Sequence, residues 1–307
     1  MLNGFLTRSV ERRETTVLFS GIRGFTSFSE KMGPAEVVDF LNRYFAKMNG
    51  LLVHCKGTPG KLIADAGMCF WEHTSEKKDD AMRAVVAALE MIHAVEDLRG
   101  VLVLPGGAKF EIEIGINTGL MVVGTVGSHA RSSRTVIGDN VELGSHLKSL
   151  NKYYGTKIII ADSTFDAIQG TVFCRQLDTI RIEGEPRPVT IYEPMGMRHS
   201  NHERRRMDRR GAPTPETRIV KAMVPARHGE RRNERRMGAE RLMVKPEQEE
   251  IAAMYGHALA LFRKGELEEA GMGFDHVLAL SPTDGPSRLM KSRIAGQCTE
   301  HARAESC

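Results

Sequence analysis

Two long helical segments, separated by strand-like hairpins, constrain the fold of this chain most strongly. Residues 34–55 and 78–98 place apolar side chains three or four positions apart, which predicts two amphipathic helices. Residues 15–20 form a β-branched, apolar strand, and residues 61–71 predict a hairpin that turns at residues 64–66. Helices that alternate with hairpins predict an α+β domain of the ferredoxin-like kind, with a mixed, largely antiparallel sheet and helices on one face.

The next segment continues this pattern to about residue 194. Residues 109–127 alternate apolar and polar side chains, and we expect them to form a hairpin that turns at residues 117–119. Residues 139–155 predict a helix ended by Gly155, residues 157–162 a strand, and residues 179–194 a final hairpin. We therefore expect one sheet domain over residues 1–195.

The composition is that of a globular protein without a membrane span. The 307 residues are 41% hydrophobic and 27% charged, and no apolar run approaches the roughly 18 residues of a transmembrane helix. The first residues lack the apolar stretch of a secretion signal, so we expect a cytoplasmic location. Five scattered cysteines without a CxxC pair predict free thiols rather than a disulfide frame or a zinc cluster.

The positive charge is concentrated in one segment of the chain. Residues 198–242 contain 14 Lys and Arg against 6 Asp and Glu, while the net charge of the whole chain is only +4. Arginine clusters can bind nucleic acid or anionic lipid, but acidic residues interrupt these clusters and no aromatic residue is present for base stacking. We interpret residues 196–247 as an Arg-rich flexible linker and do not expect nucleic acid binding.

Residues 248–295 predict a small all-α helical hairpin, followed by a tail at residues 296–307. Small and apolar residues recur at helical spacing on both sides of a turn at Lys264 and Gly265. The pattern resembles a single tetratricopeptide repeat followed by the start of a capping helix. One repeat cannot bury its own apolar face, so we expect it to dock on a protein partner or on the preceding domain.

Five sequence blocks between Arg12 and Tyr192 resemble the catalytic domain of class III adenylate and guanylate cyclases. In chain order they are VLFSGIRGFTSFSE, KGTPGKLIADAGMCFW, IGINTGLMVVGTVGS, RTVIGDNVELGSHLKSLNKYYGTKIII and IEGEPRPVTIYE. The resemblance implies a head-to-tail homodimer, or a heterodimer with another class III cyclase domain, with active sites at the interface. It also implies a reaction in which the 3′-hydroxyl of a nucleoside triphosphate attacks the α-phosphorus, with Mg²⁺ or Mn²⁺ as the cofactor if nucleotide binding persists.

The resemblance assigns the metal-binding and base-reading positions. Gly21 stands where the family has its first metal-binding aspartate, and the second is retained as Asp65, although one carboxylate binds magnesium weakly. The base-reading lysine is retained as Lys61, and Thr135 occupies a position that is Asp or Thr in adenylate cyclases, which favours adenine. Without the resemblance, Asp65 is best interpreted as a hairpin-turn residue, and Lys61 and Thr135 are equally well interpreted as ordinary surface residues.

The groups that stabilise the transition state and the triphosphate are substituted. The asparagine and arginine of the family, one helical turn apart, become Glu142 and His146. The triphosphate-binding lysine becomes Glu185, close to a second acidic residue, Glu183. The glutamates place negative charge where a triphosphate would lie, and a neutral histidine restores little of the arginine charge. The alternative for Glu142 and His146 is a plain i,i+4 pair on an exposed helix face.

These substitutions support three interpretations. The first is a catalytically degenerate cyclase domain that acts as a dimerising regulatory or scaffold partner in cyclic-nucleotide signalling, since both half-sites of this chain are damaged. The second is a weakly active adenylate cyclase that converts ATP to cyclic AMP and pyrophosphate. The third is a remnant of a larger sensor-cyclase, because the chain begins close to its first expected strand.

Overall fold

The computed structural model describes residues 10–72, 79–100, 102, 104–107, 109–127, 132–198 and 240–304. The strands are β1 (Glu11–Ile22), β2 (Thr58–Ile63), β3 (Ala66–Glu72), β4 (Ile112–Gly127), β5 (Ser132–Ile137), β6 (Ile158–Ala161), β7 (Val172–Ile180) and β8 (Val189–Met197). The helices are α1 (Phe25–Ser29), α2 (Pro34–His54), α3 (Asp80–Leu98), α4 (Asp139–Tyr154), α5 (Asp162–Ile168), α9 (Pro246–Lys264), α10 (Leu267–Leu280) and α11 (Gly285–Ala304). Most of the expected linker, residues 199–239, lies outside the described residues.

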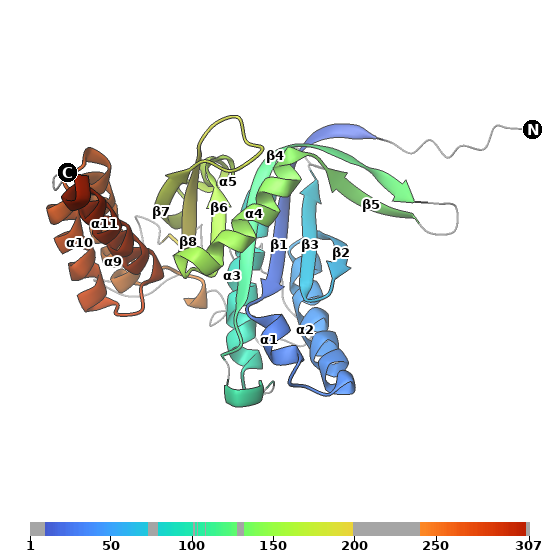
Figure 1. Cartoon of the computed structure of the whole chain (residues 1–307). Coiled ribbons are helices and arrows are strands. Elements are labelled where there is room, and N and C mark those ends of the chain that lie inside the picture. The colour runs from blue at the N-terminus through green and yellow to red at the C-terminus, as the bar shows by residue number, and fades with distance from the viewer. Residues whose placement is uncertain are drawn as a thin grey trace, which may run out of the picture.

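Within these residues, eight strands form one mixed sheet. Their order is β2-β3-β1-β4-β6-β8-β7, and β5 pairs with β4 outside this path. β4 and β6 run parallel, whereas β1 pairs antiparallel with both β3 and β4. The predicted α+β class with a mixed, largely antiparallel sheet is confirmed (Figure 1).

The prediction that the helices lie on one face of the sheet is wrong, because helices cover both faces (Figure 1). Successive side chains of a strand point to opposite faces, and the neighbours Val17 and Leu18 of β1 are both fully buried. Leu18 belongs to the large apolar cluster with α2 and α3, whereas Val17 lies beneath α4, where a Cβ on Gly144 would come 2.9 Å from its side chain. Strand β1 is therefore covered by helices on both sides.

The prediction of a turn at residues 117–119 is wrong. Strand β4 continues through this point, and Gly119 pairs with Thr15 of β1. Buried Asn117 donates its side-chain amide to the backbone oxygen of Asn140 at 2.8 Å, and a Cβ on Gly119 would lie 2.5 Å from the Asn140 side chain. Asn and Gly, which usually indicate a turn, here allow the start of α4 to approach the strand closely. The chain reverses instead between β4 and β5.

Helices α9, α10 and α11, which we call the helical module, dock on the sheet domain beside β7 (Figure 1). The module has its own apolar cluster around Tyr255 and Phe274. The Tyr255 hydroxyl donates to the backbone oxygen of Leu177 in β7 at 2.9 Å. The expectation that this segment docks on a neighbouring surface is thus met by the preceding domain itself.

Charged side chains complete this contact. Arg175 of β7 binds Glu193 of β8 at 2.6 Å and Asp284, which precedes α11, at 2.7 Å, and its side chain is only 4% exposed. Burial by itself lowers the pKa of Arg175. The two carboxylates have the larger combined effect and raise this pKa above its usual value. Arg293 of α11 binds Asp178 of β7 at 2.6 Å.

Among the helices that the structure describes, none combines the length and the apolar character of a membrane-spanning segment.

Candidate functional site

Helix α4 lies directly on strands β1 and β4, and this close contact decides where its side chains point. A Cβ on Gly115 of β4 would lie 2.2 Å from the backbone nitrogen of Lys148. The Asn151 side chain donates to the backbone oxygen of Ile114 at 2.8 Å, so the helix is also hydrogen-bonded to the strand. The helix ends at Gly155, as expected from the sequence, and Gly155 has a left-handed conformation (φ 70°).

The first group of predicted positions meets at the end of β1. Asp65, in the turn between β2 and β3, accepts a hydrogen bond from the backbone N–H of Ile22 at 2.8 Å. Gly21 precedes Ile22 and pairs with Glu113 of β4. Arg23 binds the Glu113 carboxylate at 2.8 Å, so that carboxylate is already engaged in an ion pair. The structure therefore brings Gly21 and Asp65 together.

A residue that sequence reasoning missed lies at the same place. A Cβ on Gly21 would be 3.5 Å from Oδ2 of Asp65 and 3.5 Å from Nζ of Lys148. Lys148 comes from α4, whereas Asp65 comes from the turn between β2 and β3, so side chains of two different elements approach the end of β1. Residues two apart on a helix point in different directions, so the sequence places Lys148 on a different face of the helix from His146. It does not indicate that Lys148 reaches Gly21.

The second group of predicted positions lines a small cavity of about 40 Å³ between α4 and the loop that joins β7 to β8. Glu142 and His146 come from α4, and Glu183 and Glu185 come from the loop. Asp139, at the start of α4, adds a further carboxylate that sequence reasoning did not single out. The cavity is thus surrounded by acidic side chains, and an unscreened polyphosphate would be repelled there.

The two base-reading candidates lie on neighbouring edges of the sheet. Lys61 is exposed on β2, whereas Thr135 is only 5% exposed on β5, opposite Gly124. Neither residue lines the cavity beside Glu142.

The residues present do not fit a two-metal centre. Within the described part of the chain, no three His, Cys, Asp or Glu side chains come together as a metal site requires. Cys55, Cys69 and Cys174 are free thiols, as expected, and burial raises the pKa of each to about 12. At neutral pH these thiols stay protonated and are poor metal ligands.

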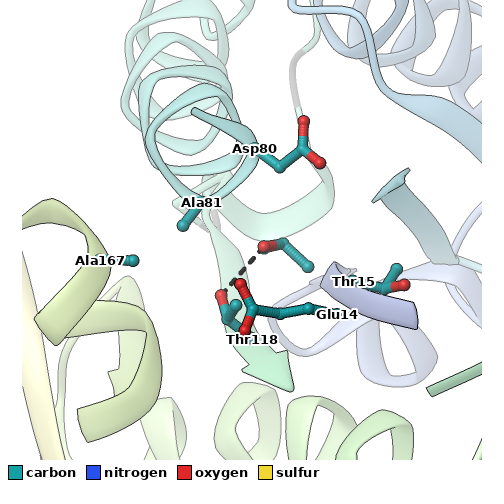
Figure 2. Close-up of a pocket in the computed structure, with 7 residues that line it drawn as sticks. Glu14, Thr15, Asp80, Ala81, Thr118 and Ala167 are labelled. Atoms are coloured by element: carbon teal, nitrogen blue, oxygen red, sulfur yellow. Dashed lines mark hydrogen bonds between the residues drawn. The ribbon is translucent and has the colours of Figure 1, made fainter. Parts of the chain in front are cut away.

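A larger cavity of about 220 Å³ lies elsewhere, between α3, α5 and the β1–β4 pair. Figure 2 shows Thr15, Thr118, Glu14 and Asp80 around it. The Thr118 hydroxyl is hydrogen-bonded to that of Thr16 at 3.0 Å, so this wall offers no unpaired hydroxyl to a ligand. None of the positions predicted from the sequence lines this cavity.

The sheet domain matches a known protein family. Residues 8–193 match the family model described as the adenylate and guanylate cyclase catalytic domain. The chain belongs to this family. The matched range runs from residue 8 into the last strand, β8, and contains Gly21, Asp65, Glu142 and Glu185.

Several relatives and solved structures are similar to this cyclase domain. The chain is 35% identical over 187 residues to a terminal-differentiation specific adenylate cyclase of Dictyostelium discoideum and 34% identical over 185 residues to an adenylate cyclase of Anabaena cylindrica. Both matches cover 59% of this chain, but only 8% and 36% of those relatives. The crystal structure of the adenylyl cyclase CyaB from P. aeruginosa is 33% identical, with a TM-score of 0.55, and the match covers 61% of this chain and 95% of that one.

Proposed function

We propose that this cyclase domain is catalytically degenerate and serves as a dimerising regulatory or scaffold partner in cyclic-nucleotide signalling. The observation that carries the proposal is the acidic cavity, where Glu142 and Glu185 lie together at positions that hold an amide and a cation in the family. Preorganised positive and hydrogen-bond-donating groups usually make the largest contribution to stabilising such a transition state. Carboxylates at both positions would destabilise the negative charge that develops there.

The end of β1 supports the same conclusion. Gly21 supplies no ligand, and Asp65 is left with the N–H of Ile22 and the nearby ammonium of Lys148. A magnesium ion that bridges a triphosphate is usually held by at least one or two carboxylates. We therefore do not expect Asp65, alone and close to a cation, to hold a magnesium ion.

A dimer is supported by exposed apolar side chains around β2, β4 and β5. Leu62 and Ile63 at the end of β2 are 49% and 70% exposed, and Leu120 and Ile137 of the β4–β5 pair are 65% and 56% exposed. Figure 1 shows that the β4–β5 hairpin projects from the body of the domain. We propose that a second class III cyclase domain covers this surface, which we call the β2–β5 surface (Leu62, Ile63, Leu120 and Ile137).

The activity test uses the unmodified chain and a restored variant. We expect no cyclic AMP or cyclic GMP from the wild type with ATP or GTP and Mg²⁺ or Mn²⁺. The variant Gly21→Asp, Glu142→Asn, His146→Arg and Glu185→Lys regains the missing groups, and we expect its turnover to exceed the wild-type background by at least about 100-fold, since one such group is worth about 10²–10³. Mass spectrometry of the cyclic nucleotide measures both.

The competing function is a weakly active adenylate cyclase, which the retained Lys61, Asp65 and Thr135 favour. Clear turnover of ATP by the wild type, abolished by Asp65→Asn, would support that function and overturn the proposed one. A restored variant that stays silent although it is folded and dimeric would show that more than these four positions separates the chain from an active cyclase.

The dimer is tested by the variant Ile137→Lys. An unpaired charge at a buried interface position costs about 1–2 kcal/mol or more, so we expect the dimer to dissociate about tenfold more readily. Sedimentation velocity over a concentration series measures the change. Met272→Lys is the matched control, because Met272 is 54% exposed on α10, away from the β2–β5 surface. A wild type that is monomeric throughout, or a control that dissociates equally, would contradict the proposed dimer.

A further inference from the structure

The ammonium of Lys148 lies in the place that the missing side chain of residue 21 leaves open. The ideal Cβ position of Gly21 is 3.5 Å from Lys148 Nζ and 3.5 Å from Asp65 Oδ2, and these are the two nearest atoms. A cation from α4 and a carboxylate from the β2–β3 turn therefore both border this space, without a direct ion pair between them. Opposite charges on two sides of a space this small attract, and both residues are only partly exposed.

The backbone of α4 holds Lys148 in this position. Its nitrogen lies against β4 so closely that Gly115 has no room for a Cβ, and its carbonyl oxygen accepts from the Asn151 side chain at 3.0 Å. The start of the lysine side chain is thus fixed by packing of the helix on the sheet. Only the methylene chain beyond it is free to adjust, and it extends toward the end of β1.

We propose that Lys148 is an internal cation that replaces the divalent metal ion at the end of β1 and keeps metal ions out. The inference rests on the proposed function, because it explains how Asp65 is kept in a cyclase fold that has lost its other metal ligand. The ammonium supplies one positive charge beside Asp65 without any bound ion. A divalent cation that approached Asp65 would meet this ammonium and be repelled by it.

The proposal predicts that Gly21→Asp alone restores metal binding only in part. Gly21→Asp fits sterically, because its Cβ would make only ordinary contacts of 3.5 Å or more and Gly21 does not have a positive φ. The introduced carboxylate, however, would lie next to Lys148. In Gly21→Asp alone, we therefore expect the ammonium to bridge this carboxylate and that of Asp65, and so to compete with metal.

The test measures Mn²⁺ binding by electron paramagnetic resonance in the folded chain, without nucleotide. We expect no binding to the wild type and weak binding to Gly21→Asp. Adding Lys148→Met to Gly21→Asp should tighten binding at least about tenfold, and a further Asp65→Asn should abolish it. Lys152→Met on the Gly21→Asp background is the matched control, because Lys152 is an exposed lysine of the same helix and its loss changes the net charge equally.

A second measurement, the unfolding temperature, tests the proposal if the double variant folds poorly. Mn²⁺ should raise the unfolding temperature of Gly21→Asp/Lys148→Met, or of Gly21→Asp/Lys148→Gln, because a ligand that binds only the folded state stabilises it, and it should not do so for the wild type. Equal Mn²⁺ affinity with and without Lys148, or tight binding by the wild type, would overturn the inference. Neither result depends on turnover, so they are distinct from failure of the proposed function, which is detected as cyclic nucleotide made by the wild type.

Discussion

Replacing Arg175 by methionine is expected to release the helical module from the cyclase domain. The side chain is 4% exposed and joins Glu193 of β8 to Asp284 of the module, and its guanidinium lies 5.0 Å from the centre of the Tyr255 ring. Removing one partner of a buried ion pair leaves an uncompensated charge and typically costs about 3–5 kcal/mol. Undocking would return both carboxylates to water, so we expect the module to open rather than the whole chain to unfold.

Hydrogen–deuterium exchange of α9 and α10 measures this opening, together with the unfolding temperature of the chain. The matched control is Lys291→Met, because Lys291 pairs with Asp275 inside the module but both side chains are well exposed. Such pairs are worth at most about 1 kcal/mol. If α9 exchanged as slowly in Arg175→Met as in the wild type, the buried ion pair would not be what holds the module in place.

Replacing Gly115 by alanine is expected to push α4 away from β4. The new methyl group would lie 2.2 Å from the Lys148 nitrogen and 2.3 Å from the Gly144 oxygen. Both are backbone atoms, so no side-chain rotation relieves the clash. Overpacking of this kind costs about 1–3 kcal/mol and more where the backbone must move. Urea unfolding measures the loss, and displacement of α4 should also move Lys148 from the end of β1.

The matched control is Gly50→Ala in α2. A Cβ there meets no atom within 4 Å, and alanine is the better helix former by about 0.5–1 kcal/mol. We therefore expect Gly50→Ala to leave the free energy of unfolding unchanged or to raise it. A Gly115→Ala variant as stable as the wild type would contradict the close contact between α4 and β4.

The architecture was largely predictable because it depends on local periodicity. Spacings of two and of three or four residues correctly indicated β1, α2, α3 and α4. The turn expected at residues 117–119 failed because Asn and Gly serve two purposes that sequence alone cannot separate. They favour turns, and they also permit close contact with a neighbouring element, as Asn117 and Gly119 do with Asn140.

The residue types on which the proposed loss of catalysis depends are read from the amino-acid sequence alone. Folding does not change which residue occupies a position, and the order of the family blocks was sufficient to locate the four positions Gly21, Glu142, His146 and Glu185. Their surroundings, in contrast, depend on the three-dimensional fold. The fold brings Glu142 and Glu185 to one cavity, Lys148 to the gap beside Gly21, and the helical module to β7. These contacts join residues far apart in the chain, and long-range packing of α4 on the sheet, rather than any local pattern, creates them.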